Sequence, residues 1–125
     1  MGFTLGYSPD ALVGDDGLME AKSRRQRFQV QTIIGGVPDE HVLQLQTGLL
    51  VTGRKWIDYV SYCGGMPMAT IRVQPDAEIQ EAIIAAASGF EQRIADCIAD
   101  YQSELSSGRL RWLPTERVIE QEMHL

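Results

Sequence analysis

The sequence lacks several features that mark common protein classes. It has two cysteines, Cys63 and Cys97, and neither belongs to a CxxC motif or a Cys/His cluster, so we expect no zinc site. No apolar run approaches the roughly 18 residues of a membrane helix. The first residues also lack the basic and then apolar stretches of a signal peptide. We therefore expect a cytoplasmic protein that has no contact with a membrane.

An excess of basic residues is missing as well. The net charge of −6 argues against a protein that coats DNA through charge alone. Residues 1–75 carry seven basic and seven acidic side chains, whereas residues 76–125 carry four basic and ten acidic ones. An acidic metal site also counts as negative until its cations bind. The balanced first part of the chain is therefore compatible with an anionic ligand.

The 125 residues fit one small domain, which we place at residues 1–106, followed by a tail at 107–125 with a short helix starting near residue 113. Apolar periodicity predicts an α/β (α+β) fold with a small central mixed β-sheet flanked by helices. The expected strands are residues 4–13, interrupted near Pro9, then 18–22, 56–62 and 68–73. The turn Asp16-Gly17 joins the first two strands into an antiparallel hairpin.

Helices are expected between and after these strands. Residues 23–34 suit a short helix or loop that Ser23 would cap, and a second helix runs from Pro38 to a stop at Gly53. A long helix begins near Pro75 and ends before Gly108. Its apolar residues recur every three or four positions from 79 to 105. We expect this stripe to cover the sheet, with a subunit contact as the alternative.

Charged residues of the hairpin are arranged for metal chemistry. Side chains alternate along a strand, so Glu20 and Lys22 share one face, while Met19 and Ala21 point to the other face, which we expect to be the core side. Asp10 reaches the same edge from the neighbouring strand. Two carboxylates and the Ala21 carbonyl form an all-oxygen set that suits Mg²⁺ or Mn²⁺.

Such a site suits the hydrolysis of an anionic phosphodiester. A bound divalent ion would invert the local charge, polarise a phosphoryl oxygen and lower the pKa of a bound water. Lys22 would position or deprotonate that water, or neutralise developing charge. Gln44, on the next helix, would orient the water or hold a phosphate oxygen. Gln46 lies two positions further and faces another way, so we expect only one of the two amides in the site.

The stretch from Ser8 to Lys22, Ser-Pro-Asp-Ala-Leu-Val-Gly-Asp-Asp-Gly-Leu-Met-Glu-Ala-Lys, resembles the core motif of the phage lambda-type exonucleases, the YqaJ-like viral recombinase family. Residues 42–46, 50–56 and 58–62 resemble the helix and strand that follow this motif in the family. The resemblance extends in register over residues 3–75.

The resemblance implies a restriction-endonuclease-like core of the PD-(D/E)xK type. It implies a two-metal, Mg²⁺-dependent exonuclease that degrades double-stranded DNA ends from 5′ to 3′ in phage recombination. A single-strand annealing protein and a ring-shaped homotrimer are further implications. Carried onto this sequence, the metal ligands are Asp10, Glu20 and the Ala21 carbonyl, the catalytic lysine is Lys22, and the motif glutamine is Gln44.

The sequence also departs from the family pattern. The family has a helical segment before the motif, so we expect an N-terminally truncated core. Ala11 replaces a glycine, Ser23-Arg24 stands where the family has Cys-Pro, and Gly64-Gly65 replaces a charged pair. These changes keep two alternatives open, an inactive remnant or accessory subunit that binds DNA or protein, and an unrelated small α/β binding domain.

Two further sets of residues have alternative interpretations. Arg24, Arg25 and Arg27 would either contact DNA phosphates or form a solvated basic patch. His41 is expected to be a surface residue of the second helix, with a metal contact as the alternative. Trp56 and Tyr59 are expected to fill the core, with stacking on DNA bases as the alternative.

Overall fold

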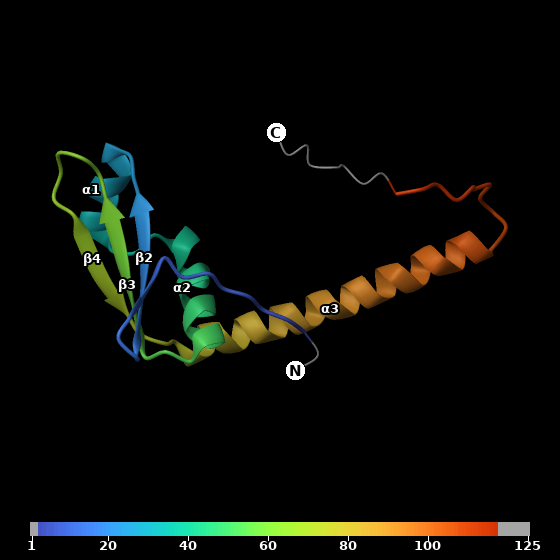
Figure 1. The fold of residues 1–125 in the computed structure, drawn as a ribbon, viewed down its shortest axis with the longest axis horizontal. Helices are drawn as coiled ribbons and strands as arrows, with labels where there is room; N and C mark the ends of the chain where they lie inside the picture. Colours follow the sequence, from blue (N-terminus) through green and yellow to red (C-terminus); the bar gives the residue numbers. More distant parts are fainter. Residues whose placement is uncertain (1–2, 118–125) are drawn as a thin grey trace, which may run out of the picture. The chain divides into compact units, whose positions relative to one another are not determined.

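The computed structural model describes residues 3–117 and contains a four-stranded sheet with three helices (Figure 1). The strands are β1 (Ala11–Val13), β2 (Gly17–Ser23), β3 (Trp56–Tyr62) and β4 (Ala69–Val73). The helices are α1 (Gln26–Gly35), α2 (Asp39–Thr52) and α3 (Ala77–Ser106). None of the helices in this part of the chain is long and apolar enough to cross a membrane.

The sheet is mixed and follows the order β1-β2-β3-β4, which confirms the predicted fold class. β1 and β4 pair antiparallel with their neighbours, whereas β2 and β3 are parallel and are connected through α1 and α2. The parallel register places Glu20 beside Tyr59 and Lys22 beside Ser61. Paired residues share a sheet face, so these four side chains lie on the same side.

Most predicted elements are present, with differences at their ends. β3 has the predicted bounds, and α2 ends as predicted at Gly53, whose φ of 67° is the left-handed conformation that glycine adopts readily. Residues 4–7 form no strand. Ser23 is the last residue of β2 and caps nothing, because α1 begins three residues later with Arg25 at its N-cap.

One face of the sheet forms the core with α2. Leu18 and Ile57 from the strands pack with Leu45 and Leu49 from α2, and all four are at least 98% buried. Glu20 lies on this same face, whereas Met19 is half-buried and Ala21 exposed on the opposite face. The expectation that Met19 and Ala21 face the core is therefore wrong. Alternation predicts two faces but not which of them the helices cover.

The opposite face carries a polar and aromatic cluster. The Arg72 guanidinium binds both carboxylate oxygens of Asp58 and stacks on the Trp56 ring at 3.7 Å from its centroid. Trp56 in turn lies against Gly17, where any side chain would overlap the indole ring. Trp56 is half-buried on this face, so the expectation that it fills the core is wrong. α1 and α2 leave this face of the sheet uncovered, and the cluster gives it a defined structure.

The start of α3 is attached to α2 by Gln46. Its side chain donates to the Gln74 carbonyl and accepts from the backbone N–H of Asp76. α3 itself has no buried residue, and Ile98 and Tyr101 are more than half exposed. α1 and α2 occupy the inner face of the sheet, so the expectation that α3 covers the sheet is wrong for residues 77–91, the part of α3 in the same unit as the sheet.

The chain divides into two units, residues 1–91 and 92–125, with the boundary inside α3. The expected boundary after residue 106 stays a prediction. Residues 107–117 contain no helix, and the rest of the expected C-terminal helix lies outside the described residues.

Gly48 of α2 offers a test of the packing beside the core. A Cβ atom at this position would lie 2.7 Å from ring atoms of Tyr7, so Gly48→Ala should destabilise the fold by about 1–3 kcal/mol. Gly35→Ala is the matched control, because Gly35 is also helical and nothing lies within 4 Å of its added Cβ. Urea denaturation measures both. Equal stabilities of the two variants would contradict the packing described.

Candidate active site

Glu20 is a buried carboxylate, with 4% of its surface exposed, that receives three donors. The Tyr7 hydroxyl donates to its Oε2 at 2.6 Å, and the Gln44 amide donates to its Oε1 at 2.9 Å. Lys22 Nζ lies 3.2 Å from the same Oε1. A buried charge is stable only when it is paired and hydrogen-bonded, so these contacts fix the orientation of the carboxylate.

Lys22 and Gln44 are also bound to each other. Lys22 Nζ donates to Gln44 Oε1 at 2.9 Å, so one amide group accepts from the lysine and donates to Glu20. The lysine side chain keeps 25% of its surface exposed and is accessible from solvent. Gln46 faces the start of α3 instead, so only one of the two glutamines reaches these residues, as predicted.

Asp10 lies at the edge of the sheet, directly before β1. The antiparallel register pairs Ala11 with Met19, so the next position along places Asp10 beside Glu20. Asp10 Oδ2 accepts a hydrogen bond of 2.8 Å from the backbone N–H of Ala21. Ala21 lies beyond the residues that β1 pairs with, so the Asp10 side chain provides the acceptor there. The structure thus brings Asp10, Glu20, Lys22 and Gln44 into one region. The metal-ligand role of the Ala21 carbonyl stays a prediction.

Tyr7 is a residue of this site that the sequence analysis missed. Its ring packs against Gly48 and the core, and its hydroxyl contacts Glu20. Burial raises the pKa of Tyr7, and the hydrogen bond to Glu20 and the charges of Glu20 and Asp10 add to this. The feature of the sequence that indicates a place for Tyr7 in this site is its position directly before Ser8-Pro9-Asp10.

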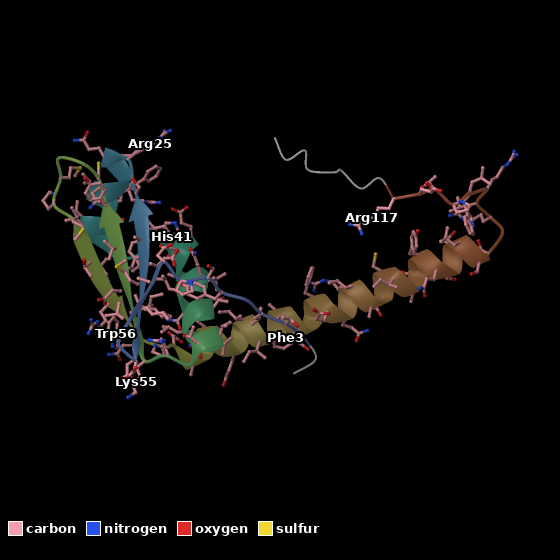
Figure 2. All side chains as sticks on the ribbon, in the orientation of Figure 1. Phe3, Arg25, His41, Lys55, Trp56 and Arg117 are labelled. Atoms are coloured by element: carbon pink, nitrogen blue, oxygen red, sulfur yellow. The ribbon has the colours of Figure 1, made fainter. Side chains whose placement is uncertain are left out.

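His41 lies one turn before Gln44 on α2 and is half-buried, contrary to the expected surface position (Figure 2). Its Nδ1 shares a hydrogen bond of 2.7 Å with the hydroxyl of Tyr59, which is fully buried in the core as predicted. Burial lowers the pKa of His41, and the positive charges of Arg24 and Lys22 lower it further.

The three predicted DNA-contacting arginines have different surroundings. Arg24 is largely buried and lies 3.3 Å from Glu40, with its guanidinium over the Phe28 ring. Arg27 is exposed and stacks on the same ring at 4.5 Å. Arg25 is exposed at the end of the sheet where α1 begins (Figure 2). Only Arg24 is therefore held next to the residues around Glu20.

The described residues contain no group of three or more His, Cys, Asp and Glu side chains that could hold a metal ion. A cation beside Lys22 would therefore have the carboxylates of Asp10 and Glu20 and nearby backbone carbonyls as its oxygen ligands. Such a set leaves most positions of an octahedral ion to water, which is the usual arrangement for protein-bound Mg²⁺.

Comparison with known proteins gives this geometry a context. No protein-family model matches the chain, and no curated protein sequence does. Among solved structures, the chain is similar to an alkaline exonuclease, LHK-Exo, from Laribacter hongkongensis. The TM-score is 0.72 and the identity 31%, over 80% of this chain and 54% of that one. This chain has an exonuclease fold.

The complex of LHK-Exo with dAMP gives a similar match, with a TM-score of 0.70 and 32% identity over 80% of this chain and 53% of that one. The chain therefore spans about half the length of the exonuclease that it matches. These matches support the nuclease part of the resemblance seen in the sequence.

The hydrogen bond from Tyr7 to Glu20 can be tested by stability. Tyr7→Phe keeps the ring but removes one donor from a buried carboxylate, which should cost about 1–3 kcal/mol in the free energy of unfolding. Tyr62→Phe is the control, because Tyr62 is 53% exposed and should change stability by less than about 0.5 kcal/mol. Urea denaturation in the presence of EDTA measures both. A Tyr7→Phe variant as stable as the parent would show that the bond does not form.

His41 should give the fold a defined pH dependence. Its pKa is lowered from 6.5 in the folded chain, so the unfolded chain binds more protons between the two values. The stabilising contribution is complete above pH 6.5 and is lost as the pH falls through the folded-state pKa. Urea denaturation between pH 7 and pH 5, as an approximate range, should show stability falling less in His41→Gln than in the parent chain. Identical slopes would contradict the assignment.

Proposed function

We propose that the chain is a metal-dependent deoxyribonuclease that hydrolyses phosphodiester bonds of linear double-stranded DNA from its ends. The observation that carries the proposal is the contact network of Glu20, Lys22 and Gln44, beside Asp10, in a chain with an exonuclease fold. A buried carboxylate next to a solvent-accessible lysine suits the handling of water and phosphate.

The residues present fit a divalent cation. Asp10 and Glu20 are hard oxygen ligands, and Asp10 uses only Oδ2 in the described contacts, which leaves Oδ1 available. With the Ala21 carbonyl they would hold Mg²⁺ or Mn²⁺. The ion would supply a Lewis acid and a bound water of lowered pKa.

The chain's own residues perform the remaining tasks. The Gln44 amide holds Lys22 and Glu20 in a fixed relation, because it binds both at 2.9 Å. Lys22 places a positive charge at the edge of the buried site, where it can neutralise a phosphoryl oxygen or take part in proton transfer to water. Tyr7 keeps the other oxygen of Glu20 in place.

Finer features of the proposal rest on the resemblance to the phage lambda-type exonucleases. They are two-metal chemistry on a PD-(D/E)xK core, 5′ to 3′ direction, a role in phage recombination with a single-strand annealing protein, and assembly as a homotrimer. Digestion of duplexes labelled at either the 5′ or the 3′ end tests the direction. Sedimentation equilibrium tests the oligomeric state.

A second candidate function is DNA binding without hydrolysis, as an accessory subunit. The observation that favours it is the presence of only two carboxylates near Lys22, with no larger acidic group in residues 3–117. All three donors around Glu20 would also compete with a cation for its oxygens.

Digestion of linear duplex DNA with Mg²⁺ or Mn²⁺ separates the two functions. The parent chain should release nucleotides only with metal, and EDTA should stop the reaction. Lys22→Ala and Glu20→Ala should each lower the rate by about 100-fold or more, because each removes a group that acts on the reacting atoms.

Lys55→Ala is the matched control and should leave the rate unchanged. Lys55 is an exposed lysine that pairs with Asp16 at the opposite end of the sheet from Arg25 (Figure 2). Absence of metal-dependent digestion by the parent chain would overturn the nuclease function. Digestion unaffected by both substitutions would overturn the site.

A further inference from the structure

A second polar cluster lies beside Lys22 and is not used by the chemistry described above. It consists of Arg24, which follows β2, and of Glu40 and His41 in the first turn of α2. Arg24 continues the parallel pairing, since its backbone N–H donates to the Tyr62 carbonyl at 2.7 Å. Because side chains alternate, Glu20, Lys22 and Arg24 follow one another along the same face.

Arg24 has more donors than partners. Its side chain is 13% exposed, and its Nε is buried without a hydrogen-bond partner among the described residues. Its one ion pair joins Nη2 to Glu40 Oε1 at 3.3 Å. Pairs between a guanidinium and a carboxylate are usually about 2.7–2.9 Å long and often involve two hydrogen bonds. The guanidinium is therefore poorly satisfied for a buried cation.

One oxygen of Glu40 marks the place of an anion. Glu40 Oε1 lies 3.3 Å from Arg24 Nη2 and 3.8 Å from His41 Nε2, so it stands between the two residues. The Glu40 side chain is 63% exposed, which makes it easy to displace. His41 is held by Tyr59 on its other nitrogen and so presents Nε2 toward this oxygen.

Displacement of Glu40 would leave a local charge that favours an anion. The charges of Arg24, Lys22, Glu40 and Glu20 all act on His41, so without Glu40 two cations would stand against one carboxylate beside it. A phosphate oxygen would meet the same two residues as Glu40 and would bring further oxygens for the unused donors of Arg24.

We propose that Arg24 and His41 bind a phosphate group of DNA, and that Glu40 occupies this position until DNA displaces it. The inference rests on the proposed function, since it assumes a DNA substrate beside Lys22. It distinguishes Arg24 from Arg25 and Arg27, which are exposed and make no ion pair within the described residues.

Fluorescence anisotropy with a labelled duplex in EDTA tests the site without digestion. Arg24→Gln should weaken binding about tenfold and should lower the slope of log Kd against log salt by about one. Glu40→Gln should strengthen binding by about threefold, because the competing carboxylate is gone. A purely structural Arg24–Glu40 pair predicts no such gain.

Two neutralising substitutions serve as matched controls. Arg25→Gln and Asp39→Asn each remove one exposed charge next to the site residues, and neither side chain makes a described contact with Arg24 or His41. Each should change affinity by less than about twofold. Thermal melting of Arg24→Gln checks its folding, and the gain in Glu40→Gln cannot arise from unfolding.

Clear outcomes overturn the inference. They are equal losses in Arg24→Gln and Arg25→Gln, equal gains in Glu40→Gln and Asp39→Asn, or no binding of duplex by the folded parent chain. Duplexes with a 5′-phosphate and a 5′-hydroxyl identify the source of the phosphate, because a loss seen only with the former assigns a terminal group. Digestion with Mg²⁺ is measured separately, so the nuclease function and this site can fail independently.

Discussion

The burial of one carboxylate sets the conditions for the rest of this structure. Glu20 is almost inaccessible to solvent, and an unpaired charge in that position would cost several kcal/mol. Its partners therefore come from three separate parts of the chain, Tyr7 before the hairpin, Lys22 on the same strand and Gln44 on α2. The N-terminal segment, β2 and α2 are held together at the point where the chemistry is expected.

A small residue, Gly48, makes it possible for Tyr7 to reach Glu20. The Tyr7 ring reaches Glu20 only by passing close to α2, and Gly48 provides the space. The helix itself is anchored by Leu45 and Leu49 in the core, each of which contributes on the order of 1.5–3 kcal/mol through burial. The same helix thus supplies core residues on one face and, directly before Leu45, the Gln44 amide at the edge of that face, so core packing and site geometry depend on each other.

Local patterns predicted much of the fold and part of the site. The antiparallel hairpin, the alternation in β3 and the stop at Gly53 each depend on neighbouring residues, and each appears in the structure. The turn of the hairpin lies at residues 14–16, one position before the predicted Asp16-Gly17, and Gly17 already pairs with Val13. The covered face of the sheet depends on where α2 packs, which alternation does not contain, so Met19 and Ala21 were placed on the wrong side. Tyr7 and His41 were missed for the same reason, because their partners Glu20 and Tyr59 lie 13 and 18 residues away.

The order of side chains along one strand explains how so short a segment can hold residues of very different character. On the covered face, Leu18 lies in the core, Glu20 at its polar border, Lys22 at the edge and Arg24 just beyond the strand. Each step of two residues advances about 6–7 Å along the strand, from apolar contact to buried charge, then to the accessible Lys22 and to the largely buried Arg24. The alternation that builds the sheet therefore also places Lys22 and Arg24 in sequence on one face, directly after the buried Glu20.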